Sequence, residues 1–118
     1  MSAWIGHYEI SASDVDRAQR FWSGVLGWEF GENVMPEGEY RMARTGEQSG
    51  AAVSSSGSPG NPTVYFNVDD LEASLAKVRD LGGSAEDKSP VPGMGWFAHC
   101  TDSEGNAFSL WQQDPNAA

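Results

Sequence analysis

The chain contains two similar segments about half its length apart. Residues 7–16 align with residues 63–72 at a constant offset of 56 positions, and both copies read as an alternating strand, an acidic residue and the start of a helix. The same offset relates Gly27 to Gly83 and Tyr40 to Trp96. A repeat this long predicts one pseudo-twofold domain over residues 1–118, with repeats at 1–57 and 61–114, rather than a solenoid of short units.

Composition narrows the classes of partner. The chain carries 7 basic and 17 acidic residues, a formal net charge of −10, which argues against binding to nucleic acid or to an anionic membrane. This charge favours a cationic ligand, although it also serves solubility. Cys100 is the only cysteine, so no intrachain disulfide is expected, and neither a signal peptide nor a membrane-length apolar stretch is evident. We therefore expect a cytoplasmic protein.

Periodicity and capping residues predict the elements of each repeat. Residues 4–11 alternate as a strand, and a helix capped by Ser13 or Asp14 follows, with Gly24 or Gly27 at its end. Further strands are expected at 40–44 and 50–54, with another at 28–30, before a turn-rich linker at 54–62. The second repeat predicts a strand at 63–68, a helix capped by Asp69 or Asp70, and a hairpin formed by 97–101 and 107–111.

Alternation also separates two faces of the predicted sheet. The apolar side chains of Val64, Phe66 and Val68 are expected to receive the helix. The opposite face would then carry a mixture of aromatic and polar groups, the usual composition of a small-molecule pocket: Ile5, His7, Glu9, Ala51, Val53, Thr63, Tyr65, Asn67, Ala107, Ser109 and Trp111. The competing interpretation is that these side chains only fill the interior of the sheet.

Three segments resemble the vicinal oxygen chelate superfamily, which includes glyoxalase I, bleomycin-resistance proteins and extradiol dioxygenases. They are residues 21–28 (FWSGVLGW), 92–98 (PGMGWFA) and 102–111 (DSEGNAFSLW). The resemblance implies an α+β fold in which two βαβββ modules form an open, cup-shaped mixed sheet with helices on the outer face. It also implies a homodimer.

Enzymes of this superfamily hold a divalent metal at four repeat-related strand positions. Carried onto this chain, these positions are His7, a residue at or next to Val53, Thr63 and Ser109. Only His7 is a good donor, and a metal of the zinc type needs about three, so we predict no metal or other cofactor. A non-standard site that combines His7 and Glu9 with His99 or Cys100 stays open, because adjacent strand residues point to opposite sides and the sequence does not say which one faces inward.

The favoured hypothesis is a metal-free protein that binds a small aromatic or cationic ligand in the cup. The predicted binding residues are His7, Glu9, Val53, Thr63, Tyr65, Asn67, Trp96, Ser109 and Trp111. The alternative is a glyoxalase-like lyase or isomerase in which His7 and Glu9 transfer protons, with or without a weakly bound metal. A third hypothesis is a regulatory or partner-binding domain without catalysis.

Overall fold

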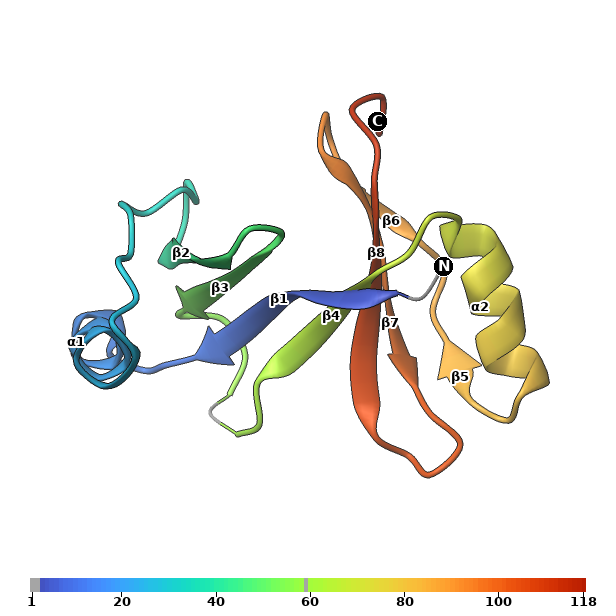
Figure 1. Ribbon diagram of the computed structural model, residues 1–118, viewed down its shortest axis with the longest axis horizontal. Helices are drawn as coiled ribbons and strands as arrows, with labels where there is room; N and C mark the ends of the chain where they lie inside the picture. The colour runs from blue at the N-terminus through green and yellow to red at the C-terminus, as the bar shows by residue number, and fades with distance from the viewer. Residues whose placement is uncertain (1–2, 59) are drawn as a thin grey trace. The chain divides into compact units, whose positions relative to one another are not determined.

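Each half of the chain folds as a strand, a helix and further strands. The computed structural model describes residues 3–58 and 60–118 (Figure 1). It divides into two units, which we call the His7 unit (residues 6–63) and the His99 unit (residues 3–5 and 64–118). Pro59, within the predicted linker, and residues 1–2, within the first predicted repeat, lie outside the described residues.

The His7 unit contains β1 (Trp4–Ser11, of which Trp4 and Ile5 belong to the other unit), α1 (Val15–Leu26), β2 (Tyr40–Gly46) and β3 (Ser49–Ser54). β3 lies between the other two strands, antiparallel to β2 and parallel to β1. The side chain of Asp14 caps α1 by accepting a hydrogen bond from the backbone N–H of Arg17 at 3.1 Å. Gly27 ends the helix at φ 73°, a conformation that favours glycine.

α1 packs on one face of these strands. Arg41 on β2 donates to Asp16 and Gln19 of α1, at 2.8 and 2.9 Å. Because Arg41 pairs with Val53, and Val53 with Ile10, these side chains share the face that α1 covers. His7 and Glu9, two residues apart on β1, therefore lie on the face that α1 leaves uncovered.

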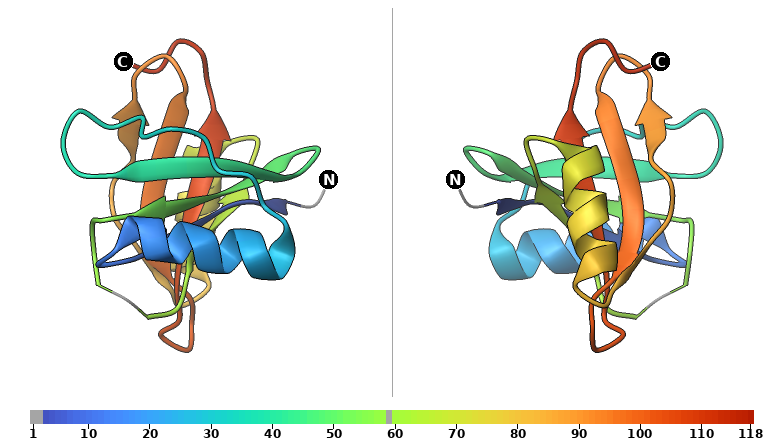
Figure 2. Two further views of the ribbon diagram at one scale, coloured as in Figure 1. Left: turned by 90° about the vertical axis from the view of Figure 1, so that its left-hand side faces the viewer. Right: turned by 90° about the vertical axis from the view of Figure 1, so that its right-hand side faces the viewer.

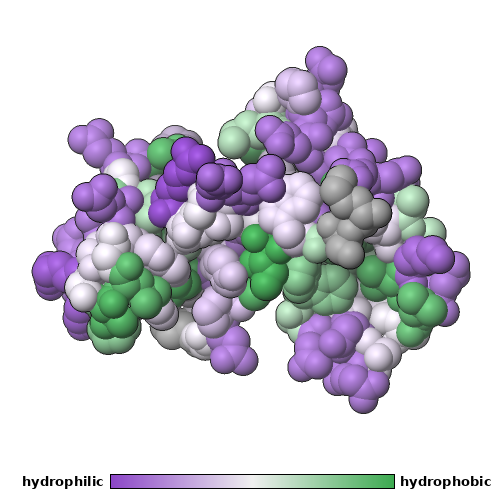
Figure 3. Space-filling view, in the orientation of Figure 1, coloured by the Kyte–Doolittle hydropathy of each residue, from purple (hydrophilic) through white to green (hydrophobic). Residues whose placement is uncertain are grey.

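The apolar stripe of α1 is only partly buried. Val15 is buried, whereas Phe21 and Val25 are 58% and 61% exposed, so these two do not join the core as their spacing suggested. A hydrophobic patch is correspondingly visible over α1 at the left of the space-filling view (Figure 3).

The His99 unit contains β4 (Thr63–Asn67, of which Thr63 belongs to the other unit), α2 (Leu71–Asp80), β5 (Ser84–Ala85), β6 (Ser89–Val91), β7 (Gly95–Thr101) and β8 (Ala107–Gln113). Its strands run in the order β4-β8-β7-β5, and β6 pairs with β7. Asp70 caps α2, and Leu71 and Leu75 of the helix pack with Ala98, Cys100 and Leu110 of the strands in the core of the unit. Figure 2 shows α2 lying against β7 (right view).

The predicted α+β fold with two βαβββ-like modules is confirmed. In the second module the strands after the helix are β5, β7 and β8; in the first they are β2 and β3, and the strand expected at residues 28–30 is a single bridge between Phe30 and Ala43. β6 was not predicted, because its three residues include Pro90 and carry no periodic pattern.

The pairing of the strands shows that the two repeats are related by a different offset in their last strands than at their helices. On β4 and β8, Tyr65 pairs with Ser109; on β1 and β3, the equivalent residue Glu9 pairs with Ala52. Ala52 therefore corresponds to Ser109 at an offset of 57, one more than the 56 that relates the two helix caps Asp14 and Asp70. The first half is one residue shorter between its helix and its last strands.

This single-residue difference corrects two expectations. Val53 was expected on the face of His7, but it is fully buried on the face that α1 covers, and Ala52 takes the expected place. Trp96 was expected to match Tyr40, but the pairing matches Tyr40 with Phe97. Trp96 instead packs against the core beneath α2, and its indole N–H donates to Asp114 at 3.0 Å.

Neither helix in the described residues is long and apolar enough to cross a membrane.

Candidate functional site

Three side chains of the His7 unit form a hydrogen-bonded chain on the face that α1 leaves uncovered. The hydroxyl of Tyr40 lies 2.8 Å from Nε2 of His7 and donates to Oε2 of Glu9 at 2.7 Å. His7 Nε2 and Glu9 Oε2 are themselves 3.9 Å apart, too far for a direct hydrogen bond. Tyr40 therefore bridges an imidazole and a carboxylate that do not bond to each other.

The register of the three strands brings these residues together. His7 and Glu9 project to the same side of β1 because strand side chains alternate. Tyr40 opens β2 opposite Ser54 of β3, and Ser54 in turn pairs with Ser11 of β1, so Tyr40 also projects to this side. Its ring lies nearly parallel to the His7 imidazole, with ring centroids 6.4 Å apart and 22° between the planes.

The direction of these hydrogen bonds determines where the protons are. A phenol has one proton, and Tyr40 uses it to donate to Glu9. His7 must then donate its Nε2–H to the phenolic oxygen, which leaves the lone pair of the neutral imidazole on Nδ1. Nδ1 lies on the side of Gly50, where an added Cβ would be 3.8 Å away.

Burial keeps His7 neutral. The side chains of His7 and Glu9 are 25% and 32% exposed. Burial lowers the pKa of His7 below its ordinary value of 6.5, and the nearby charge of Glu9 opposes this shift without cancelling it. The imidazole is thus predominantly uncharged at neutral pH.

The donors at the superfamily's metal positions do not fit a divalent ion. Apart from His7, these positions carry Ala52, adjacent to the Val53 of the expectation, Thr63, the first residue of β4, and Ser109 on β8. None of these three offers a nitrogen or carboxylate ligand. Nε2 of His7 and Oε2 of Glu9 are both hydrogen-bonded to the hydroxyl of Tyr40, and across residues 3–58 and 60–118 no group of three His, Cys, Asp or Glu side chains could hold a metal.

The other predicted residues lie in the His99 unit. Tyr65, Asn67, Ser109 and Trp111 share one face of β4 and β8, as expected, because Tyr65 pairs with Ser109 and Asn67 with Trp111. This face is opposite to the one that packs against α2, where Phe66 and Leu110 lie. Trp96 is not part of it.

The orientation of His99 and Cys100, which the sequence left open, follows from the pairing of β7 with β8. His99 pairs with Ser109, and its Nδ1 is 2.5 Å from Ser109 Oγ, so His99 joins the face of Tyr65 and Ser109. Cys100 points to the core beneath α2, where burial raises the pKa of its thiol. Cys100 therefore does not lie on the face of Tyr65 and Ser109.

Tyr40 is the functional candidate that sequence reasoning missed. It was recognised only as the repeat partner of Trp96, and its role depends on the register of β2 against β3 and β1. The available signal was its place at the start of a strand that faces β3, since a long polar aromatic side chain there can reach across to the first strand.

Comparison with known proteins identifies relatives over most of the chain. Residues 7–111 match a family model described as a glyoxalase-like domain. The chain is 30% identical over 112 residues to the protein named "Putative glyoxylase CFP32" of Mycobacterium bovis, covering 91% of this chain but 43% of CFP32. It is 29% identical over 127 residues to a glyoxylase-like domain-containing protein of Didymella fabae, covering 90% and 91% of the two chains. This chain thus spans less than half the length of CFP32.

Solved structures agree on the fold. Methylmalonyl-CoA epimerase from Mycobacterium tuberculosis superimposes with a TM-score of 0.67 at 18% identity, over 94% of this chain and 88% of the epimerase. At this level of identity the similarity concerns the fold alone.

Proposed function

Because the chain belongs to the glyoxalase-like domain family, we propose that it uses the family's fold to bind a small aromatic or cationic molecule without a metal ion. The polar contacts of this site are His7, Tyr40 and Glu9. The observation that carries the proposal is the position of the Tyr40 hydroxyl, at 2.8 Å from His7 Nε2 and 2.7 Å from Glu9 Oε2. A phenol thereby takes the place between imidazole and carboxylate that a metal would need.

The charge of this face and its exposed side chains support a cationic or aromatic ligand. Glu9 places a carboxylate on this face, and the net charge of −10 attracts cations to the protein as a whole. The Tyr40 ring and the 43%-exposed side chain of Met42, which shares its face, provide surface for a flat ring. A cationic aromatic molecule can thus contact the carboxylate and the ring at the same time.

The test is a binding titration with and without chelator. Cationic, neutral and anionic aromatic compounds of similar size are titrated while tryptophan fluorescence is followed, first in EDTA and then with added Zn²⁺. We expect cationic compounds to bind with the same affinity in both buffers. Glu9→Gln should weaken binding about ten-fold, the effect of losing one charged contact.

Glu47→Gln is the matched control, because Glu47 is exposed in the turn between β2 and β3 and carries the same charge. Binding that appears only when Zn²⁺ is present would overturn the proposal. If Glu9→Gln and Glu47→Gln weaken binding equally, the effect comes from the net charge of the protein and not from a contact with Glu9. That result would likewise contradict the assigned site.

The hydrogen-bonded chain also favours a second candidate, proton transfer next to a carbonyl group. His7 Nδ1 can accept a proton from a substrate while Nε2–H passes its proton to Tyr40 and Tyr40 passes its own to Glu9. The substrate loses one proton, Glu9 gains one, and the two intermediate groups end with as many as they began with.

The test of this second candidate measures the exchange of a substrate hydrogen with solvent deuterium, and not the formation of a product. The hemithioacetal of methylglyoxal and glutathione is incubated in D₂O, and loss of the C–H signal next to the carbonyl is followed by NMR. Enzyme-dependent exchange that falls at least a hundred-fold in Tyr40→Phe would favour catalysis. Exchange unaffected by Tyr40→Phe would remove the relay from the mechanism.

A further inference from the structure

A second row of polar side chains crosses the His99 unit. His99 on β7 pairs with Ser109 on β8, and the backbone N–H of Glu86, just beyond β5, donates to the carbonyl of His99 at 3.0 Å. The pairing of β5 with β7, Ala85 opposite Cys100, continues to Glu86 opposite His99. Glu86, just past the end of β5, His99 on β7 and Ser109 on β8 therefore lie side by side on one face.

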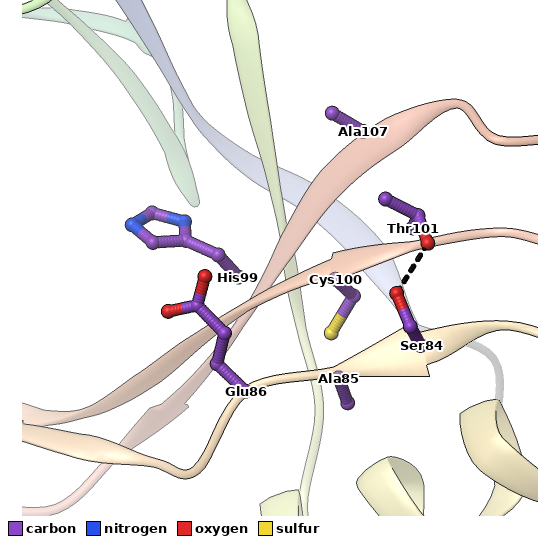
Figure 4. A pocket seen from close by; sticks show the side chains of 7 residues that line it. All are labelled: Ser84, Ala85, Glu86, His99, Cys100, Thr101 and Ala107. Atoms are coloured by element: carbon purple, nitrogen blue, oxygen red, sulfur yellow. Dashed lines mark hydrogen bonds between the residues drawn. The ribbon is translucent and has the colours of Figure 1, made fainter.

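This row borders an open pocket of about 400 Å³, a size typical of small-ligand sites. In Figure 4 the side chains of His99 and Glu86 extend in the same direction from their strands, and Thr101 and Ser84 are joined by a hydrogen bond. All lining residues belong to the His99 unit: Ser84, Ala85, Glu86, His99, Cys100, Thr101 and Ala107.

The polar groups of the pocket are mainly acceptors. Ser109, which is fully buried, holds Nδ1 of His99 and so orients the other ring nitrogen, Nε2, away from β8. Within the described residues, neither Nε2 of His99 nor the carboxylate of Glu86 has a hydrogen-bond partner. When Nδ1–H donates to Ser109, Nε2 is an acceptor beside the carboxylate, and the hydroxyl oxygens of Ser84 and Thr101 add further lone pairs.

The charge of the pocket lining distinguishes between anionic and cationic ligands. Among the described residues that line the pocket, Glu86 is the one carboxylate and none is Lys or Arg. A carboxylate or phosphate ligand would meet the like charge of Glu86, and the hydroxyl pair of Ser84 and Thr101, which shares one of its two protons, would offer it a single O–H donor. A primary ammonium group carries positive charge and three N–H donors, which match a carboxylate, an imidazole nitrogen and a hydroxyl oxygen.

We propose that this pocket is a second small-molecule site, which binds a primary amine through Glu86 and His99. The aromatic ring of Phe97, on the same face of β7 and with its centroid 5.3 Å from that of His99, provides an apolar contact for the carbon part of the ligand. This site is built from residues other than His7, Tyr40 and Glu9. The proposal can therefore be tested separately from the proposed function.

Benzylamine, benzyl alcohol and benzoate provide the test, because they share a ring and differ in the group it carries. Each is titrated into ¹⁵N-labelled protein, and the amide shifts of residues 84–86 and 99–101 are followed. Benzylamine should give saturable shifts there, benzyl alcohol should bind at least five-fold more weakly, and benzoate should give none. Glu86→Gln should weaken benzylamine at least ten-fold, and His99→Gln should weaken it as well.

Glu72→Gln is the matched control, because Glu72 is exposed on α2, which packs on the other face of the sheet. Glu9→Gln separates the two sites: it should leave benzylamine binding at residues 84–86 unchanged. Equal binding of benzoate, no loss in Glu86→Gln, or shifts confined to the residues around His7 would each overturn the proposal.

Discussion

Tyr40 determines the chemistry of the residues around it. Its hydroxyl accepts from a neutral imidazole and donates to a carboxylate, so each group receives a partner without a formal ion pair. Half-buried polar groups are costly when unpaired, and this arrangement satisfies both. Burial keeps His7 uncharged although Glu9 lies 3.9 Å away, and Tyr40 gives both groups a hydrogen-bond partner.

The pKa of His7 should respond to Glu9 in a defined direction. Burial lowers this pKa and the charge of Glu9 raises it. Glu9→Gln removes the raising contribution, so the pKa of His7 should fall further below its ordinary value. NMR titration of the imidazole C–H signals measures this, with His99→Gln used for assignment. A rise in the His7 pKa would contradict the account.

Stability should depend on His7 as the pH is lowered. Its pKa is lower in the folded protein than in the unfolded chain, so between the two values the unfolded chain binds more protons. The free energy of unfolding must then decrease as pH falls from about 6.5 towards the folded-state pKa. Urea unfolding at pH 7.5, 6.5 and 5.5 should show a larger decrease in wild type than in His7→Gln. Identical decreases would argue against a shifted His7.

At the scale of elements, the caps and turns follow from local sequence, because a cap requires only its own side chain and the next few N–H groups. Asp14 and Asp70 begin the helices and Gly27 ends α1, all within the alternatives that the sequence left open. The two-residue β5 was not predicted, because so few residues carry no period, and the strand expected at residues 28–30 is reduced to the bridge between Phe30 and Ala43.

Asp70→Ala tests the cap of α2 directly. The carboxylate of Asp70 accepts from the backbone N–H of Ala73 at 3.1 Å, and its loss should cost about 1 kcal/mol of unfolding free energy. Asp69→Ala is the matched control, because Asp69 is likewise exposed, and within the described part of the chain the cap of α2 is Asp70. Chemical denaturation of both variants measures the difference. Equal costs would argue that charge, not capping, stabilises the helix.

Gly95 positions Trp111. A Cβ at Gly95 would collide with the backbone carbonyl of Gln112 and come within 2.5 Å of Cζ2 of the Trp111 ring. Gly95→Ala should therefore displace the indole, change its fluorescence, and destabilise the protein by about 1–3 kcal/mol. Gly24→Ala is the contrast, because an added Cβ there meets nothing within 4 Å and should stabilise α1. No change in fluorescence for Gly95→Ala would contradict the packing.

At the scale of the whole molecule, the duplication predicted the architecture but not the site. The offset of 56 holds as far as the helix caps, and the pairing of the strands then requires 57. No residue pattern marks this change, because Val53 and Ala52 are both apolar and Trp96 and Phe97 are both aromatic. His7 and Glu9 were placed on one face because they belong to the first strand, whereas Tyr40 required the register of three strands.

The central claim is that a tyrosine, rather than a metal ion, joins His7 to Glu9. Long-range ¹H–¹⁵N spectra of the histidine ring nitrogens at neutral pH test it most directly, recorded in EDTA and again after one equivalent of Zn²⁺. The account predicts a His7 ring protonated at Nε2, unprotonated at Nδ1 and unchanged by zinc, with altered signals in Tyr40→Phe. Stoichiometric zinc binding that shifts the His7 nitrogens in the wild-type protein would contradict it.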